Sequence, residues 1–284
     1  MTDRPASPGP VACVIGWPVK HSRSPVIHRF WLRQYGLPGD YVIHPVAPEE
    51  ITGFLAGFAD GPFVGCNVTV PHKEAAFAAV DEVEAAGRAI GAINTIWREG
   101  DRLVATSTDG IGFLANLDEG APGWDQAAGP AVVLGAGGAA RAVLWALAER
   151  GFAPIHVVNR TRDRAEALAA RFGSAIRPAG WDALPDLLGR ARVLVNATSL
   201  GMEGQPPLDL DLTGLPEGCV VTDIVYVPLE TGLLAAARRR GLRTVDGLGM
   251  LLHQAAPGFE HWFGRKPEVT PALRAAVLRD LGVG

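Results

Sequence analysis

The feature that most constrains the fold is a short apolar run that leads directly into a glycine-rich turn. Residues 131–134 have the pattern of a buried strand, residues 135–140 read GAGGAA, and apolar side chains at helical spacing follow. Glycines at these positions allow a tight turn and bring backbone amides close to an anion at the helix N-terminus. The pattern therefore predicts a dinucleotide-binding unit, with Ala140 in place of the usual third glycine. A plain strand–helix turn is the alternative.

The end of the next predicted strand, residues 155–158, indicates which dinucleotide is bound. It is followed by Asn159, Arg160, Thr161 and Arg164, with no acidic residue at the strand end. Sites for NAD usually place Asp or Glu there to accept hydrogen bonds from the ribose hydroxyl, whereas guanidinium groups pair with a 2′-phosphate. A solvated basic helix start is the alternative, but helix N-termini disfavour cations. The sequence therefore favours NADP.

Alternation of strand-like and helix-like segments along the chain is typical of α/β proteins with parallel sheets. We expect a surface connection at residues 117–130, where glycine and proline are frequent and no periodicity is present. Further strands are predicted at residues 11–15, 41–46, 66–70, 93–97, 103–106, 193–196 and 220–225. Helices are predicted at residues 25–35, 49–59, 73–80, 251–263 and 272–281.

Composition excludes several classes of protein. The net charge of −4 gives no general attraction to nucleic acid or to an anionic membrane. No run approaches about 18 uninterrupted apolar residues, and residues 1–10 do not have the pattern of a signal peptide. The three cysteines form no CxxC pair, and no His/Cys/Asp cluster has metal-ligand spacing. We therefore expect a cytoplasmic protein without a metal.

Four polar clusters follow predicted strands in the first part of the chain. Ligands of open α/β sheets bind beyond the carboxyl ends of strands, so these clusters are expected to converge on one crevice. The hydroxyls of Ser22 and Ser24 could bind a carboxylate, and a helix N-cap is an equally good interpretation of that pair. The clusters are residues 21–25, 67–73, 91–95 and 107–110.

Nine short motifs together resemble those of the shikimate dehydrogenase family. They run in order over nearly the whole chain and read HSRSP, NVTVPHK, GAINT, STDG, GAGGAA, NRTRDR, NATSLGM, DIVY and DGLGMLLHQA. The resemblance implies a reversible NADPH-dependent reduction of 3-dehydroshikimate to shikimate, a step toward chorismate and the aromatic amino acids. Ser107 departs from the family, because many members have Asn at this position.

The resemblance also implies the roles of particular residues. Lys73 and Asp109 would be the catalytic pair, and a lysine ammonium can both stabilise a developing alkoxide and donate its proton. The substrate-binding residues would be Ser22, Ser24, Thr69, Asn94, Asp109, Tyr226 and Gln254. The cofactor-binding residues would be Gly135, Ala136, Gly137, Gly138, Ala139, Asn159, Arg160, Thr161, Arg164, Ile224 and Gly247.

Because Gln254 follows the dinucleotide-binding unit, the C-terminal helices are expected to return to the first domain. We predict an α/β fold in which residues 1–109 and 247–284 form a substrate-binding and catalytic domain with a mostly parallel sheet. Residues 110–246 would form a Rossmann-type NADP-binding domain. The expected partner is a small molecule and not nucleic acid or a membrane, and the protein would be a monomer or homodimer.

Alternative functions remain on the same scaffold. A quinate/shikimate dehydrogenase that uses NAD would be expected to have an acid at the second strand end and a changed serine pair. Methylenetetrahydrofolate dehydrogenase has a Tyr-x-x-x-Lys spacing, but here Thr69 stands four residues before Lys73. A non-catalytic NADP-binding regulator would need neither Lys73 nor Asp109.

Overall fold

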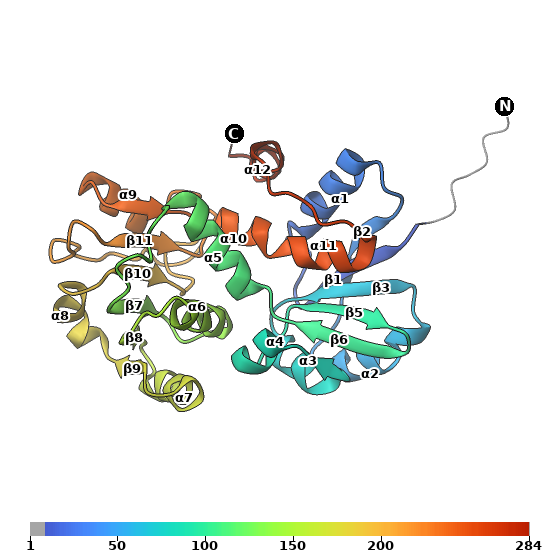
Figure 1. The fold of residues 1–284 in the computed structure, drawn as a ribbon, viewed down its shortest axis with the longest axis horizontal. Coiled ribbons are helices and arrows are strands. Elements are labelled where there is room, and N and C mark those ends of the chain that lie inside the picture. The colour runs from blue at the N-terminus through green and yellow to red at the C-terminus, as the bar shows by residue number, and fades with distance from the viewer. Residues whose placement is uncertain (1–8, 284) are drawn as a thin grey trace. The chain divides into compact units, whose positions relative to one another are not determined.

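The computed structural model describes residues 9–283, which divide into two compact units (Figure 1). The first unit comprises the chain up to Thr108 together with the segment that begins at Gln254. The second unit is the intervening segment Asp109–His253. Each unit contains its own six-stranded sheet.

The sheet of the first unit has the strand order β2-β1-β3-β5-β6-β4. The pairs β1–β2, β1–β3 and β4–β6 are parallel, and β5 is antiparallel to both β3 and β6. Parallel pairing dominates because helices connect the first three strands. The strands are β1 (Val11–Gly16), β2 (Asp40–Pro45), β3 (Phe63–Val68), β4 (Glu82–Val83), β5 (Thr95–Glu99) and β6 (Arg102–Thr106).

Helices cover both faces of this sheet. The C-terminal helix α11 packs on β3 and β5, where the Trp262 indole nitrogen donates to the carbonyl oxygen of Ile96 at 2.9 Å. Gly65 makes this packing possible, because a Cβ there would lie 1.9 Å from the same indole nitrogen. The helices are α1 (Ser24–Tyr35), α2 (Ile51–Ala56), α3 (Lys73–Ala79), α4 (Ala85–Ile90), α11 (Ala255–Phe263) and α12 (Pro271–Asp280), with a 3-10 turn at Phe58–Asp60.

The sheet of the second unit is entirely parallel and has the order β12-β11-β10-β7-β8-β9. Val132 and Val133, adjacent on β7, are both fully buried and belong to two different apolar clusters, so both faces of the sheet are covered. That is why these strands read as continuous apolar runs. The strands are β7 (Ala131–Leu134), β8 (Ile155–Val158), β9 (Ile176–Ala179), β10 (Val193–Asn196), β11 (Val220–Asp223) and β12 (Arg243–Val245).

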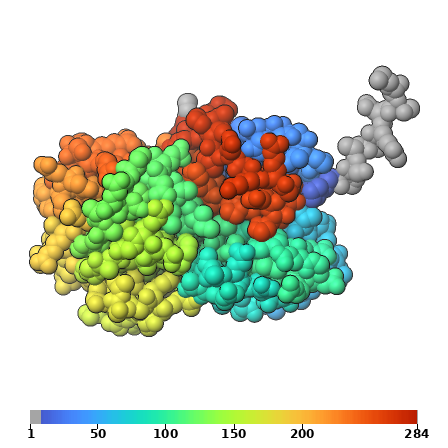
Figure 2. All heavy atoms as spheres, in the orientation of Figure 1, coloured from blue at the N-terminus to red at the C-terminus, as the bar shows by residue number. Residues whose placement is uncertain are grey.

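Strand order in this sheet reverses between β7 and β10, since the chain proceeds outward through β8 and β9 and then returns to the other side of β7. Such a switch point is where α/β sheets bind ligands. The helices are α5 (Asp109–Gly120), α6 (Gly138–Glu149), α7 (Arg162–Phe172), α8 (Leu184–Leu188), α9 (Gly232–Arg239) and α10 (Leu248–His253), with a 3-10 turn at Trp181–Ala183. The atoms of α7, in yellow, lie on the surface of this unit (Figure 2).

The predicted α/β fold with two mostly parallel sheets is confirmed. The surface connection expected at residues 117–130 is wrong in its first half: Leu117 belongs to α5, and Leu117, Ala121 and Trp124 are buried. Their apolar side chains cover one edge of the core. The glycines between them interrupt the apolar periodicity, so the sequence did not indicate a buried segment. The short strands β4, β9 and β12 were not predicted, since β9 contains Arg177 and Pro178 and has no apolar run.

The chain crosses between the two units after Thr108 and again after His253. Asp109 is the first residue of α5 and belongs to the second unit. The helix α10 also belongs to the second unit, because it packs along α5. Gly249 permits this contact, since a Cβ at that position would meet the side-chain oxygen of Asn116 at 1.8 Å.

The core of the first unit contains a buried histidine. The His28 ring is fully buried and stacks on Tyr41 with the ring centroids 4.1 Å apart. Neither ring nitrogen has a hydrogen-bond partner within the described residues. Burial lowers the pKa of His28 from 6.5 to about 3, and neighbouring Asn67 offsets part of this decrease. The hydrogen-bonding atoms of Asn67 are committed to Tyr41, Asn94 and Thr95.

His28 stays neutral in the folded state as pH falls below about 6.5. In the unfolded chain the same histidine binds a proton at this pH, so protonation favours unfolding. Folding stability is therefore lost between pH 6.5 and about pH 3. Wild type is expected to lose roughly 3 kcal/mol of its free energy of unfolding between pH 7 and pH 4 through His28. We predict that His28→Phe does not show this loss. Denaturant unfolding of both proteins across this range measures the difference. The half-buried His44, replaced in the same way, is the control, and identical pH dependence of wild type and His28→Phe would contradict the prediction.

Candidate active site

The two serines predicted to bind a carboxylate lie together at the start of α1. The Ser22 hydroxyl donates to the Ser24 hydroxyl at 3.2 Å and accepts from the Ser24 backbone N–H at 3.3 Å. The residue at the N-cap position is Arg23, whose side chain makes no capping bond and pairs instead with Asp280 at 2.8 Å. Ser22 thus serves the helix start while keeping its hydroxyl beside that of Ser24.

Lys73 is the first residue of α3, directly beyond β3 in the motif that also holds Thr69. Both side chains are half-buried. The Lys73 carbonyl oxygen accepts from the Ile93 N–H at 3.1 Å, which joins the start of α3 to the turn that carries Asn94. His72 is buried with its Nε2 2.7 Å from the Val46 carbonyl oxygen, so this histidine is a packing residue.

Asn94 and Gln254, which lie 160 residues apart, are brought together in the first unit. The Asn94 amide donates to the Gln254 side-chain oxygen at 3.1 Å. Thr108 connects them further: its hydroxyl donates to the Gln254 carbonyl oxygen at 2.7 Å, and its backbone N–H donates to the Asn94 side-chain oxygen at 2.8 Å. All three are buried. Polar groups with several fixed partners are well suited to present amides to the hydroxyls of a ring.

Asp109 follows Thr108 and begins α5 in the second unit, with its side chain half-buried. Ser107, at the position where the family more often has Asn, is buried. Gly110 lets α5 approach α6 closely, since a Cβ there would lie 2.4 Å from the Trp145 ring. The position of Asp109 is therefore set by the packing of α5 within the second unit.

The glycine turn between β7 and α6 has the geometry of an anion cradle. Gly135 has a φ of +100°, and a Cβ there would lie 2.8 Å from the Thr198 methyl carbon. At Gly137 and Gly138 a Cβ would meet no atom within 4 Å, so the space before the α6 N-terminus is open. The N-cap residue, Gly137, has no side chain to occupy the first amides of the helix. These residues fit the pyrophosphate of a dinucleotide. Ala136 and Ala139 lie half-buried in the same turn.

The end of β8 carries the basic residues predicted to bind a 2′-phosphate. The Asn159 amide donates to the Thr161 carbonyl oxygen at 2.7 Å, which shapes the turn into α7. Arg160, Thr161 and Arg164 are exposed on this turn. Arg162 differs from them because it pairs with Glu166 at 2.9 Å along α7.

The residues predicted to lie near the nicotinamide are packed together beyond β11. A Cβ at Gly247 would lie 2.4 Å from the Ile224 carbonyl oxygen and 2.6 Å from that of Val225. Only glycine therefore lets the chain pass behind this loop. Tyr226, predicted to contact the substrate carboxylate, is half-buried in the same loop.

Three buried polar residues of these sites have no role predicted from the sequence: Thr108, Asn196 and Asp223. All three lie inside the motifs STDG, NATSLGM and DIVY. A polar residue at the end of an apolar strand was the available signal, but only the structure shows what each one binds.

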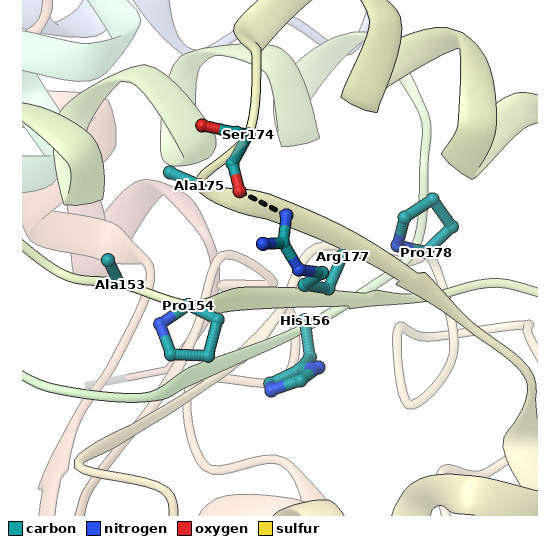
Figure 3. Close-up of a pocket in the computed structure, with 7 residues that line it drawn as sticks. All are labelled: Ala153, Pro154, His156, Ser174, Ala175, Arg177 and Pro178. Atoms are coloured by element: carbon teal, nitrogen blue, oxygen red, sulfur yellow. Dashed lines mark hydrogen bonds between the residues drawn. The ribbon is translucent and has the colours of Figure 1, made fainter.

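A hollow of about 520 Å³ lies at the other end of the second sheet (Figure 3). Its lining comes from the amino ends of β8 and β9 and includes His156 and Arg177, whereas the glycine turn follows the carboxyl end of β7. It is therefore separate from the dinucleotide cradle. Within residues 9–283, no three His, Cys, Asp or Glu side chains are grouped as a metal site, and no helix is long and apolar enough to span a membrane.

These features define an α/β protein with one dinucleotide-binding unit and one unit that presents polar side chains at its strand ends. Family models match most of the chain: the shikimate dehydrogenase substrate binding domain at residues 14–96, shikimate / quinate 5-dehydrogenase at 124–202, and the shikimate 5′-dehydrogenase C-terminal domain at 247–278. A shikimate dehydrogenase (NADP+) of Azorhizobium caulinodans is 57% identical, covering 94% of this chain and 95% of the relative. The chain belongs to the shikimate dehydrogenase family.

Solved structures agree in fold. The shikimate 5-dehydrogenase of Thermus thermophilus, in complex with NADP(H) and shikimate, has a TM-score of 0.84 and 40% identity over 95% of this chain and 99% of that one. The quinate dehydrogenase of Corynebacterium glutamicum, in complex with NAD, has a TM-score of 0.87 and 30% identity over 95% and 99% of the two chains. The fold alone therefore does not separate the two substrates or the two cofactors.

Proposed function

We propose that this protein catalyses the reversible NADPH-dependent reduction of 3-dehydroshikimate to shikimate, a step in chorismate and aromatic amino acid biosynthesis. The observation that carries the proposal is full-length similarity, in sequence and in fold, to proteins named as NADP-dependent shikimate dehydrogenases or solved with NADP(H) and shikimate. The first unit would bind the substrate and the second the dinucleotide.

The substrate has a carboxylate and ring hydroxyls, and the polar residues suit each group. The adjacent Ser22 and Ser24 hydroxyls bind the carboxylate. The Tyr226 phenol is expected to be a further ligand of the carboxylate. Thr69, Asn94, Asp109 and Gln254 bind the ring hydroxyls, with Asn94 and Gln254 held in place by Thr108.

When bound, NADPH supplies the hydride that reduces the ketone carbon. The Lys73 ammonium stabilises the negative charge that develops on the ketone oxygen and donates the proton that completes the alcohol. Asp109, the other member of the catalytic pair, accepts a hydrogen bond from the reacting hydroxyl of shikimate. In the oxidative direction Lys73 takes the proton back.

For the dinucleotide, the open space before Gly137 and Gly138 accepts the pyrophosphate, and Gly135, Ala136 and Ala139 complete the turn. Arg160 and Arg164 pair with the 2′-phosphate, and Asn159 and Thr161 shape their turn. Ile224 and Gly247 line the nicotinamide end. The absence of an acid at the end of β8 favours NADP over NAD.

A quinate/shikimate dehydrogenase that uses NAD is the second candidate, favoured by the fold similarity to the Corynebacterium enzyme. The serine pair and the arginines at the end of β8 argue against it. A non-catalytic regulator is disfavoured because Lys73 and Asp109 are both present.

The remaining properties are also proposals. We expect a monomer or homodimer in the cytoplasm, with no nucleic acid or membrane partner. The net charge of −4 gives no general attraction to nucleic acid or to an anionic membrane. Three buried free cysteines, Cys13, Cys66 and Cys219, suit a reducing compartment.

Lys73→Ala is expected to lower kcat for shikimate oxidation by about 10²- to 10⁴-fold, because the proton donor and acceptor is lost. The dissociation constant for shikimate should change little. Steady-state kinetics with NADP+ and a direct binding measurement test the two parts. Lys266→Ala, at an exposed lysine outside the proposed site, is the control. Turnover by Lys73→Ala within a few-fold of wild type would remove Lys73 from the catalytic pair.

Arg160→Ala is expected to weaken NADP+ binding by about tenfold while leaving NAD+ binding nearly unchanged, since one charge-assisted phosphate contact is lost. Arg162→Ala is a matched control from the same helix start, because Arg162 already pairs with Glu166. Calorimetric titration of each variant with both dinucleotides gives the comparison. Equal effects of the two substitutions would show that general positive charge, and not a specific contact, selects NADP.

A further inference from the structure

The second unit buries a carboxylate at the carboxyl end of β11. Asp223 is 1% exposed, and its two oxygens accept three hydrogen bonds. One oxygen accepts from the Asn196 amide and from the Val225 backbone N–H, both at 2.9 Å. The other accepts from the Thr231 hydroxyl at 2.8 Å. Burial raises the pKa of Asp223 above its ordinary value, although these bonds favour the charged form.

Asn196 extends this network from the end of the neighbouring strand β10. Its side-chain oxygen accepts from the Thr198 hydroxyl at 2.7 Å and from the Thr198 N–H at 3.1 Å. Its amide also donates to the Leu200 carbonyl oxygen at 3.1 Å. Asn196 is fully buried and lies opposite Asp223 in the register of the two strands. Its hydrogen bonds therefore fix the loop that follows β10.

The two loops fixed in this way pack against glycines of the dinucleotide site. Thr198, held by Asn196, lies against Gly135 of the glycine turn. The loop that begins at Ile224, held by Asp223 through the Val225 N–H, lies against Gly247. Because a Cβ at either glycine would overlap its neighbour, a small shift of either loop would change the shape of the site.

Stability alone does not explain a charged group at this place. Burying a carboxylate is unfavourable, and an apolar side chain of similar shape is often as stable. A carboxylate only accepts hydrogen bonds, so it holds three donors in one arrangement and excludes others. The three donors belong to β10, to the loop after β11 and to the N-cap of α9.

We propose that Asp223 and Asn196 are positioning residues of the dinucleotide site: Asp223 fixes the Ile224–Tyr226 loop at the nicotinamide end, and Asn196 fixes the Thr198 loop behind the pyrophosphate turn. Through the Ile224–Tyr226 loop, Asp223 would control how tightly and in which orientation the nicotinamide half is held, and leave the adenosine half unaffected. This inference rests on the proposed function, because the site must hold a dinucleotide.

The test compares two probes. NADP+ occupies both ends of the site, whereas adenosine 2′,5′-bisphosphate carries the 2′-phosphate but no nicotinamide. Asp223→Asn keeps the shape of the side chain but replaces one acceptor oxygen with an amide N–H donor, which then faces the donors that the oxygen had bound. We expect its dissociation constant for NADP+ to rise by about tenfold and that for the bisphosphate to change less than about twofold. Calorimetry gives both values without turnover.

Two further variants keep the test decisive. Thr231→Val removes one of the three donors to Asp223. It should raise the dissociation constant for NADP+ more than that for the bisphosphate, by a smaller factor than Asp223→Asn, and it keeps the test possible when Asp223→Asn fails to fold. Leu188→Ala makes a cavity in the same unit, on α8 before β10, and should lower the melting temperature without the split. Equal weakening of both probes, or a lower melting temperature with neither constant changed, would overturn the proposal.

The wild-type assay separates this inference from the proposed function. Wild type that binds NADP+ but does not oxidise shikimate would contradict the function, while the split between the probes would still be measurable. In an active enzyme, Asp223→Asn should also lower kcat by on the order of tenfold or more, because a misplaced nicotinamide transfers hydride poorly.

Discussion

Polar groups buried where strands end must have hydrogen-bond partners, and this requirement shapes both units of the protein. In the first unit Asn94, Thr108 and Gln254 satisfy one another at the end of β6 and the start of α11. In the second, Asn196, Asp223 and Thr231 do so at the ends of β10 and β11. Each cluster joins segments that are distant in sequence, so each sets the position of loops that no single element could fix.

The same requirement explains how the fold produces its sites. Carboxyl ends of parallel strands gather at one edge of a sheet, and the reversal of strand order between β7 and β10 marks the place where α/β sheets bind ligands. At this edge glycine lets one backbone segment approach another, as at Gly135 and Gly247. The cluster of Asn196, Asp223 and Thr231 then holds the loops around these glycines. Packing and hydrogen bonding thus create a cradle for an anion without a preformed charge at its centre.

Much of this could be predicted from the sequence. The strands at 131–134, 155–158 and 193–196 have the predicted bounds, because a strand buried on both faces is an uninterrupted apolar run. The family and cofactor class were also predicted correctly, since nine motifs in order are specific. The edge strand β9 was missed because it contains Arg177 and Pro178 and lacks an apolar run. The roles of Thr108, Asn196 and Asp223 could not be predicted, because their partners lie up to 146 residues away along the chain.

We propose that the serine pair and the arginines at the end of β8 make this family member specific for shikimate and NADP. The most direct measurement is a steady-state assay that crosses NADP+ and NAD+ with shikimate and quinate. We expect the highest kcat/KM for shikimate with NADP+, and a large loss when either component is exchanged. Equal or better turnover with NAD+ would contradict the cofactor assignment, and a preference for quinate would contradict the substrate.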